Sequence, residues 1–418
     1  MREDYALSLS KGWKVVKLKD ITKVITKGTT PSTYGYDFLE NGEVNYIRAE
    51  GISKSGYVDQ KTFLKINTEC HDRLKRSKLE ENDVLFSIAG MALGKSGIVK
   101  KEYLPANTNQ AVAIVRPNNL VFPKFLLYYI ANPSFYQLVN SVSGQAAQPN
   151  INLNQVGSLP INLPPLETQR KIASILSGYD DLIENNLKRI KILEEMAQQT
   201  YEEWFVRMRF PGYETAVMNE ETVLPEGWGK KTLIDLGKIS TGKTPSTLNE
   251  DFYNGNIPFI KTPDMNGSTY VIETNQYLTK LGSDNQKGKL IEKNSLVVSC
   301  IGSAGAFALV SKPSQFNQQI NAITFKREEY IFFTYCYSKS LKEKLEALGS
   351  NGATMTNVNK TKFEKIEIVL PDSQLLNKFH KIFKLNFENI LNLQSQNQRL
   401  REARDLLLPR LMMGIVEV

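Results

Sequence analysis

Apolar residues recur in alternating steps of four and three positions along two long stretches of the chain. A seam of this spacing, held for about four heptads, is typical of a coiled coil rather than of a helix that lies on a sheet. The pattern therefore predicts two long helices. The predicted seam positions are Ile172, Leu176, Tyr179, Ile183, Asn186, Ile190, Leu193, Ala197, Thr200 and Trp204 in the first helix, and Phe379, Phe383, Asn386, Ile390, Leu393, Asn397, Leu400, Arg404 and Leu407 in the second.

The two predicted helices are separated by enough chain to pair with each other in antiparallel fashion. Each seam carries polar residues, which are Asn186 in the first helix and Asn386 and Asn397 in the second. A buried asparagine costs stability but fixes register, because a slipped pairing leaves its amide without a partner. We expect Asn186 to lie near Asn397 across the pair; the alternative is that these asparagines face solvent.

Proline and acidic residues mark the predicted start of each helix, at residues 164–167 and 370–373. Both predicted ends, at residues 204–212 and 406–414, reach a proline and then a glycine, which is typical of helix termination. We therefore expect the two helices to end in the same way.

Between the helical stretches, short apolar runs are bounded by Gly, Asn and Ser, which predicts strands. One helical segment interrupts each set of runs, at residues 123–142 and 328–348. The pattern predicts an α+β fold with mostly antiparallel or mixed sheets, without fixing the strand order. The predicted strands span residues 43–48, 84–88 and 111–115 in the first half, and residues 257–261, 296–300 and 321–325 in the second.

The two halves repeat one another. Gly12-Trp13 returns as Gly227-Trp228, and the offset between matched residues only falls along the chain, as expected if two copies of one fold differ by a few loop deletions. The matched pairs are Gly12 and Gly227 (offset 215), Pro31 and Pro245 (214), Arg48 and Lys261 (213), Ser87 and Ser299 (212), Gln110 and Gln319 (209), and Asn150 and Asn357 (207).

This repeat predicts four segments. A first module spans residues 1–165, a first long helix 166–210, a second module 211–371, and a second long helix with a C-terminal tail 372–418. Low identity inside the modules indicates a shared scaffold with different contacts.

Composition limits the class of protein. Hydrophobic residues make up 41% of the 418 residues and charged residues 23%, as in ordinary soluble proteins. No apolar run approaches the roughly 20 residues of a membrane span, the start MREDYALSLSKGW lacks a secretory apolar core, and three unpatterned cysteines suggest a reducing compartment. We expect a cytoplasmic protein. The net charge of +8 favours a polyanionic partner.

Motifs for chemistry are weak. GKISTGKT (237–244) and AGMALGKS (89–96) fit phosphate-loop patterns, but Pro245 and Gly97-Ile98-Val99 follow them, so neither is expected to open a phosphate-binding helix. The segment 132–135 partly matches the target-gripping loop of adenine methyltransferases, although a helix break explains it. Two histidines and three scattered cysteines offer no paired spacing for a zinc site, and the acidic residues show no pattern for catalysis, so no metal, cofactor or catalytic site is predicted.

The order and duplication of these motifs resemble the DNA specificity subunit of type I restriction-modification systems, over essentially the whole chain. The motifs are the Gly-Trp opening, the GxTPS turn, the Tyr/Phe-Ile-Arg/Lys strand, the NIN or NVN turn, the LPPLETQ helix start and the closing LLLPRLMMG. The second helix start, LPDSQLLNKF, departs from the pattern and places Leu376 where the first copy has Gln169.

The resemblance implies a non-catalytic subunit with two target-recognition domains, joined by two long helices in an antiparallel coiled coil. Each domain would read one half of a bipartite double-stranded DNA target, and the helices would set the gap and dock two methyltransferase subunits, to which restriction/translocase subunits add. Alternatives are a protein-binding scaffold without DNA sequence preference, or a nucleotide-binding enzyme or methyltransferase. On this resemblance the DNA-contacting candidates are Lys27, Thr29, Thr30, Ser32, Arg48, Arg73, Lys75, Arg76, Lys95, Gln145, Gln148, Lys243, Thr244, Ser246 and Lys261, with ordinary turn and surface chemistry as the alternative for each.

Overall fold

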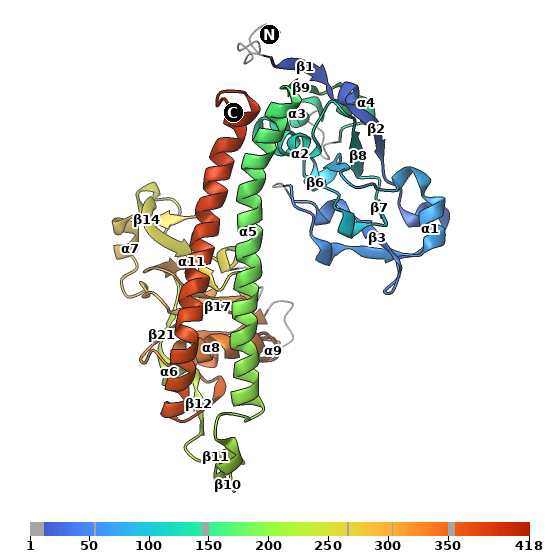
Figure 1. The fold of residues 1–418 in the computed structure, drawn as a ribbon. Helices are drawn as coiled ribbons and strands as arrows, with labels where there is room; N and C mark the ends of the chain where they lie inside the picture. The colour runs from blue at the N-terminus through green and yellow to red at the C-terminus, as the bar shows by residue number, and fades with distance from the viewer. Residues whose placement is uncertain (1–11, 54–55, 144–149, 266, 303, 350–355) are drawn as a thin grey trace. The chain divides into compact units, whose positions relative to one another are not determined.

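The computed structural model describes residues 12–418 except 54–55, 144–149, 266, 303 and 350–355. The chain divides into two compact units, Met1–Asp181 with Leu400–Val418, and Leu182–Arg399. Each unit contains one module and part of each of two long helices, α5 (Leu166–Tyr201) and α11 (Ser373–Met412) (Figure 1).

The described strands of the first module form three sheets. One is antiparallel with the order β2-β8-β5-β6, one has the order β4-β3-β7 with β3 and β7 parallel, and β1 pairs with β9. The strands are β1 (Lys14–Lys17), β2 (Thr22–Lys27), β3 (Val44–Ile47), β4 (Leu64–Ile66), β5 (Val84–Ser87), β6 (Ser96–Ile98), β7 (Ala106–Thr108), β8 (Val112–Pro117) and β9 (Pro160–Leu163), and the α-helices are α1 (Thr68–Arg73), α2 (Pro123–Ala131), α3 (Pro133–Ser143) and α4 (Leu153–Ser158).

The second module repeats this strand order. Its main sheet is β13-β21-β17-β19-β15, its three-stranded sheet is β16-β14-β20, and β12 pairs with β23. The strands are β12 (Gly229–Thr232), β13 (Gly237–Thr241), β14 (Tyr253–Ile260), β15 (Tyr270–Val271), β16 (Tyr277–Leu278), β17 (Leu296–Ser299), β19 (Phe307–Val310), β20 (Gln315–Phe316), β21 (Ile320–Phe325) and β23 (Glu367–Leu370), with the short pair β18 (Ile301–Gly302) and β22 (Thr356–Asn357) and the hairpin β10 (Met218–Asn219) and β11 (Leu224–Pro225); the helices are α6 (Leu233–Leu236), α7 (Lys280–Asp284), α8 (Tyr330–Tyr337), α9 (Leu341–Gly349) and α10 (Lys360–Glu364).

The predicted α+β class, the internal repeat and the predicted strands are confirmed. Equivalent elements differ by 215 residues at β1 and β12 and by 207 at β9 and β23. One predicted match was wrong by a residue, because β8 and β21 differ by 208 and therefore align Gln110 with Gln318 rather than Gln319. Each predicted helical segment is also two helices, and the first breaks at Asn132, between α2 and α3.

The central strand β5 is apolar because both of its faces are covered. Val84 and Phe86 point into a core shared with α2, while Leu85 points into a second core with Ile47 of the three-stranded sheet. Alternate residues of a strand face opposite sides, so a strand between two cores needs a continuous apolar run.

The antiparallel pairing of the long helices is confirmed. In the second unit, Asn186 Nδ2 donates to Asn397 Oδ1 at 2.9 Å, and the rings of Trp204 and Phe379 lie 6.0 Å apart. Residue numbers rise from Asn186 in α5 to Trp204 in the turn that continues it, while they fall from Asn397 to Phe379 in α11, so the helices run in opposite directions. The predicted register contact between Asn186 and Asn397 is therefore present, and both residues are buried.

Most of the predicted seam is buried, in part against the modules as well as between the helices. Leu193 and Leu400 are only partly buried, whereas Phe387, which the seam prediction omitted, is fully buried. Asn386 was predicted in the seam, but it is half-buried, and Phe387 takes the inward place by stacking on Phe332 of α8 at 4.2 Å. The buried seam residues are Ile172, Leu176, Ile183, Asn186, Ile190 and Ala197 of α5, and Phe379, Phe383, Ile390, Leu393 and Asn397 of α11.

The helix ends do not match as predicted. Regular α-helix ends at Tyr201 in α5, and a π-helical turn follows at Glu202–Val206. In contrast, α11 continues through Pro409 to Met412. The expectation of equal ends was wrong because Pro409 does not stop α11, while Met208, with φ of +58°, departs from helical geometry before Pro211 is reached.

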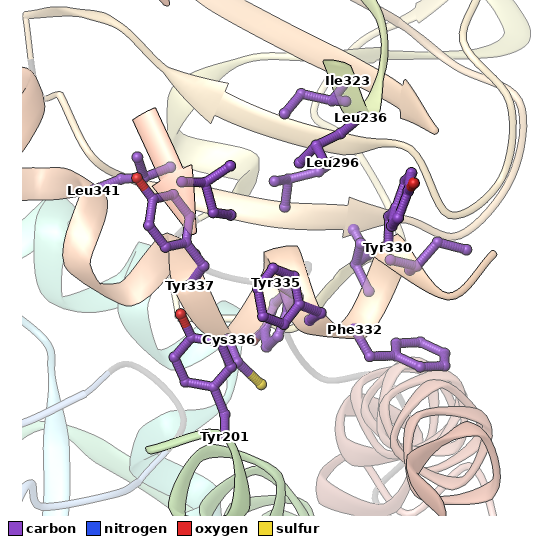
Figure 2. Close-up of a cluster of buried hydrophobic side chains, with 14 of the residues drawn as sticks. Tyr201, Leu236, Leu296, Ile323, Tyr330, Phe332, Tyr335, Cys336, Tyr337 and Leu341 are labelled. Carbon is purple, nitrogen blue, oxygen red and sulfur yellow. The ribbon is translucent and has the colours of Figure 1, made fainter. Parts of the chain in front are cut away.

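Helix α8 lies between the sheet of the second module and the long helices. All eight of its residues are buried. Figure 2 shows Leu296 and Ile323 of the sheet on one side of α8, and Tyr201 of α5 on the other. A helix that is apolar on every side is one buried on every side, so α8 binds this module to its part of the helix pair.

Candidate nucleic-acid interface

A glycine turn follows the first strand of the main sheet in each module. A Cβ on Gly28 would lie 2.0 Å from the carbonyl oxygen of Thr108, and a Cβ on Gly242 would lie 2.1 Å from that of Asn317. Only glycine can approach the neighbouring backbone this closely. The N–H of each glycine donates to the opposing strand at 3.1 Å, so both turns are held in the same position.

The same side-chain pair follows the glycine in both modules. The hydroxyl of Thr30 donates to the side-chain oxygen of Gln110, and the hydroxyl of Thr244 donates to that of Gln318. All four residues come from the segments that the glycine brings into contact. We refer to them as the threonine–glutamine pairs.

A cluster of exposed cations lies next to this turn in the first module. Arg73 ends α1, and Lys75 and Arg76 lie in the 3-10 turn that follows. The Arg73 guanidinium stands 4.9 Å from the centroid of the Tyr34 ring, and Arg76 Nη2 donates to Thr29 Oγ1 at 3.3 Å. Segments separated by 47 residues thus form one basic edge. Within the described part of the chain, no carboxylate forms an ion pair with these three cations.

A buried amide positions the short helix in each module. Asn107 Nδ2 donates to Leu74 O at 3.2 Å and to Ser77 Oγ at 3.0 Å, which fixes the segment that carries Lys75 and Arg76. In the second module, Gln315 Nε2 donates to Ser283 O at 3.0 Å and to Ser283 Oγ at 2.7 Å. Because a buried amide is costly without partners, it ties the helix end to the sheet.

The corresponding edge of the second module carries lysines but no arginine. Lys243 and Ser246 are exposed in the glycine turn, and Leu248, three residues after Pro245, is 95% exposed. Helix α7 is followed by the exposed Lys287. The two modules therefore share the backbone of this edge but differ in side chains.

One further cation follows the middle strand of each three-stranded sheet. Arg48 follows β3, and its buried Nε has no hydrogen-bond partner among the described residues but forms an ion pair with Glu50 Oε2 at 4.0 Å. Lys261 follows β14, with its Nζ 6.0 Å from the centroid of the Phe259 ring. The two cations therefore occupy matching positions of the repeat.

Comparison with known proteins decides the family. A sequence model described as the type I restriction modification DNA specificity domain matches residues 10–195 and again residues 225–398. The chain belongs to this family. It is 31% identical to the HindI specificity subunit of Haemophilus influenzae, a type I restriction enzyme component, over 96% of this chain and 99% of that protein. It is 27% identical to the MjaIX specificity subunit of Methanocaldococcus jannaschii over 98% and 95%.

The fold of a solved relative agrees. The crystal structure of a type I restriction-modification S subunit from M. genitalium superposes with a TM-score of 0.60 at 16% identity, covering 97% of both chains. At that identity the likeness shows the fold alone. The two matched segments of the family model fall on the two repeated modules and the adjoining helices of this specificity subunit.

The remaining candidate residues of the specificity subunit are scattered. Lys27 ends β2 and Ser32 is exposed in the glycine turn, so both adjoin the basic edge. Lys95 lies instead in the hairpin between β5 and β6, where its carbonyl accepts from Ser87 N at 2.8 Å. Gln145 and Gln148 lie outside the described residues.

The phosphate-loop matches are parts of the sheets. Residues 237–241 of one match are strand β13, and the other match ends at Ser96, the first residue of β6. Neither is followed by a helix whose N–H groups could hold phosphate, as predicted.

The thiols of the specificity subunit are enclosed. Burial raises the pKa of Cys300 to about 11 and also raises those of Cys70 and Cys336, so these groups are held as thiols. Across the described ranges, no three His, Cys, Asp or Glu residues gather as a metal site would require. Within the same ranges, no helix has the length and apolarity to cross a membrane.

Three residues of this edge were not among the residues predicted from the sequence. They are Tyr34 beneath Arg73, Leu248 at the matching turn position, and Lys287 at the position that matches Lys75. The repeat offset could have found Leu248 and Lys287, since 214 added to 34 and 212 added to 75 give their numbers.

Proposed function

We propose that this chain selects the DNA target of a type I restriction-modification complex. Modules 1–165 and 211–371 are its target-recognition domains, and each contacts one half of a bipartite sequence. The helices at 166–210 and 372–418 set the gap between the halves and dock two methyltransferase subunits, to which restriction/translocase subunits add. The chemistry belongs to those partners.

One observation supports this proposal most directly: the same arrangement of residues occurs at the matching edge of both modules. Each module presents a glycine turn held by a threonine–glutamine pair, with cations beside it. Cations without carboxylate partners attract phosphate, and the amide, hydroxyl and guanidinium groups at the edge are those that contact base edges. Two such edges in one chain suit a target with two halves.

The helix pair supports a fixed gap. Register between α5 and α11 in the second unit is fixed by the buried contact of Asn186 with Asn397. An asparagine pair of this kind leaves other registers with unpaired amides. A gap that tolerated several lengths would contradict this role.

Methylation mapping tests the proposal. The complete system is expressed in a host without other methyltransferases, and modified sites are sequenced. The expected result is one bipartite motif with one gap length, and synthetic targets with the gap lengthened or shortened by one base pair should lose modification. Methylation without a sequence motif would support the alternative of a protein-binding scaffold.

The strand-end cations offer a residue-level test. Arg48→Ala and Lys261→Ala should each weaken DNA binding by the assembled complex, with a shallower dependence of affinity on salt, by about one unit of slope. Lys171→Ala, on the exposed face of α5, is the matched control and should leave both unchanged. Equal effects of all three changes would argue against the assignment.

A further inference from the structure

When the two modules are matched by the repeat offset, the residues of the basic edge divide into those shared by both modules and those that differ. The caps of the short helices, Asn67 on Cys70 N and Thr279 on Gly282 N, fix the offset there at 212. At that offset Lys75 falls on Lys287, so a lysine is kept in both modules. The other kept features are the threonine–glutamine pairs and the cations Arg48 and Lys261.

The exposed serines Ser32 and Ser246 also match, but several other positions of the same edge differ. Arg73 matches Asn285 and Arg76 matches Gly288, while Tyr34, three residues after Pro31, matches Leu248, three residues after Pro245. The first module therefore presents two guanidinium groups and an aromatic ring where the second presents an amide and an isolated leucine.

Physical chemistry assigns different roles to these two sets. Contacts with phosphate fix the position of a protein on DNA but carry no sequence information, whereas contacts with base edges carry it. Two modules of one scaffold that read unlike sequences can share the former and must differ in the latter.

We propose that the unshared residues at this edge are the base-reading residues of each module, and that the shared cations hold phosphates. This inference rests on the proposed function. Arginine matches the two acceptors of guanine, asparagine matches adenine, and an apolar side chain suits the methyl group of thymine. The half-site of the first module then contains guanine, read by Arg73 and Arg76, and that of the second contains an A·T pair, read by Asn285 and Leu248.

The geometry of the first module supports this role. Tyr34 is 48% exposed, and its ring carries the Arg73 guanidinium 4.9 Å from the centroid, so the planar fork is oriented before DNA arrives. Arg76 is oriented differently, by donating a hydrogen bond from Nη2 to Thr29 Oγ1 at 3.3 Å. Orienting long side chains in advance lowers the entropy lost on binding, which is the cost that a specific contact must overcome.

The test compares an unshared pair with a shared cation in the complete complex. The double variant Arg73→Asn, Arg76→Gly gives the first module the residues of the second. We expect discrimination at one or two guanine positions of one half-site to fall roughly 10- to 100-fold, with the other half-site and the gap unchanged. Lys75→Ala should weaken binding about equally for all sequences, so the methylation motif stays the same.

Arg73→Lys provides a finer control, because it keeps the charge but loses the planar fork. It should retain overall affinity at low salt while relaxing the preference for guanine. The proposal is overturned if the double variant keeps the complete motif, if Lys75→Ala changes the motif, or if neither half-site contains guanine. A wild-type complex without any motif would instead overturn the proposed function itself.

Discussion

Gln169, near the start of α5, should stabilise the first unit more than a leucine at the same position would. Its Oε1 accepts from Phe122 N at 2.7 Å, and its Nε2 donates to Pro164 O at 2.9 Å and to Leu120 O at 3.1 Å, while the residue is 1% exposed. The equivalent residue of the repeat is Leu376, which is also 1% exposed but lies in an apolar core. Placing the residue of each site at the other site therefore tests whether one site requires glutamine and the other leucine.

Gln169→Leu removes three hydrogen bonds and leaves one N–H and two carbonyls without their partner. At about 1 kcal/mol or more for each buried group, the unfolding free energy of the first unit should fall by about 3 kcal/mol. Leu376→Gln buries an amide among apolar side chains, and the second unit should lose about 2 to 4 kcal/mol. Either loss is a large part of the roughly 5 to 15 kcal/mol that stabilises a domain.

Urea unfolding of the full chain gives the free energies, and hydrogen exchange at the Phe122 amide reports the local effect. Protection of that amide should drop in Gln169→Leu and stay unchanged in Leu376→Gln. Gln374→Leu makes the same chemical change at an exposed position of α11 and should shift stability by less than about 0.5 kcal/mol. A Gln169→Leu chain as stable as this control would refute the reasoning.

Three further changes have expected outcomes. Gly28→Ala should lower the unfolding free energy of the first unit by at least about 2 kcal/mol, measured by thermal unfolding, because the added Cβ clashes with Thr108 O. Gly178→Ala, in an open helical position, should instead raise it by about 0.5 to 1 kcal/mol, and equal effects would contradict the close-contact argument. Burial lowers the pKa of His380, so the second unit should be fully stable above pH of about 6.5 and lose stability as pH falls through the lowered value, and His380→Phe should flatten that part of the pH profile. Asn397→Leu should destabilise the second unit by about 1 to 3 kcal/mol, because buried Asn186 loses its 2.9 Å hydrogen bond and keeps only a longer one to Gln396 at 3.4 Å. Replacing both asparagines by leucine should recover much of that loss, while a spin-label distance between α5 and α11 shows more than one register; a single sharp distance would count against the register role.

The local sequence pattern was enough to predict those elements in which apolar residues recur with a fixed period. The heptad spacing predicted the two long helices, and the chain between them allowed the antiparallel pairing. The polar seam positions predicted the contact of Asn186 with Asn397, and apolar runs predicted strands such as β5 and β17. These features follow from which face of an element is buried. The strand order did not follow, because β5 pairs with β8 through contacts between segments far apart in the chain.

The prediction failed where tertiary contacts override the period. Phe387 is buried because Phe332 of α8 stacks on it, which no spacing within α11 reveals. At the candidate interface, the sequence identified Thr29, Arg73 and Arg76, but only the fold shows that Arg76 reaches Thr29 and that Tyr34 supports Arg73.

Contacts of the second module with both long helices tie the position of this module to the register of the helix pair. Tyr270 N, at the edge strand β15, donates to Gln394 of α11 at 3.0 Å, and Thr269 donates to Glu194 of α5. These contacts cover a sheet edge that would otherwise be open, and α8 seals the same module to both helices through its apolar side chains. A shift of one helix along the other cannot leave all three contacts in place. The module, with its proposed DNA-contacting edge, is therefore held relative to its part of the helix pair, and the contact of Asn186 with Asn397 that fixes register also fixes the position of that edge.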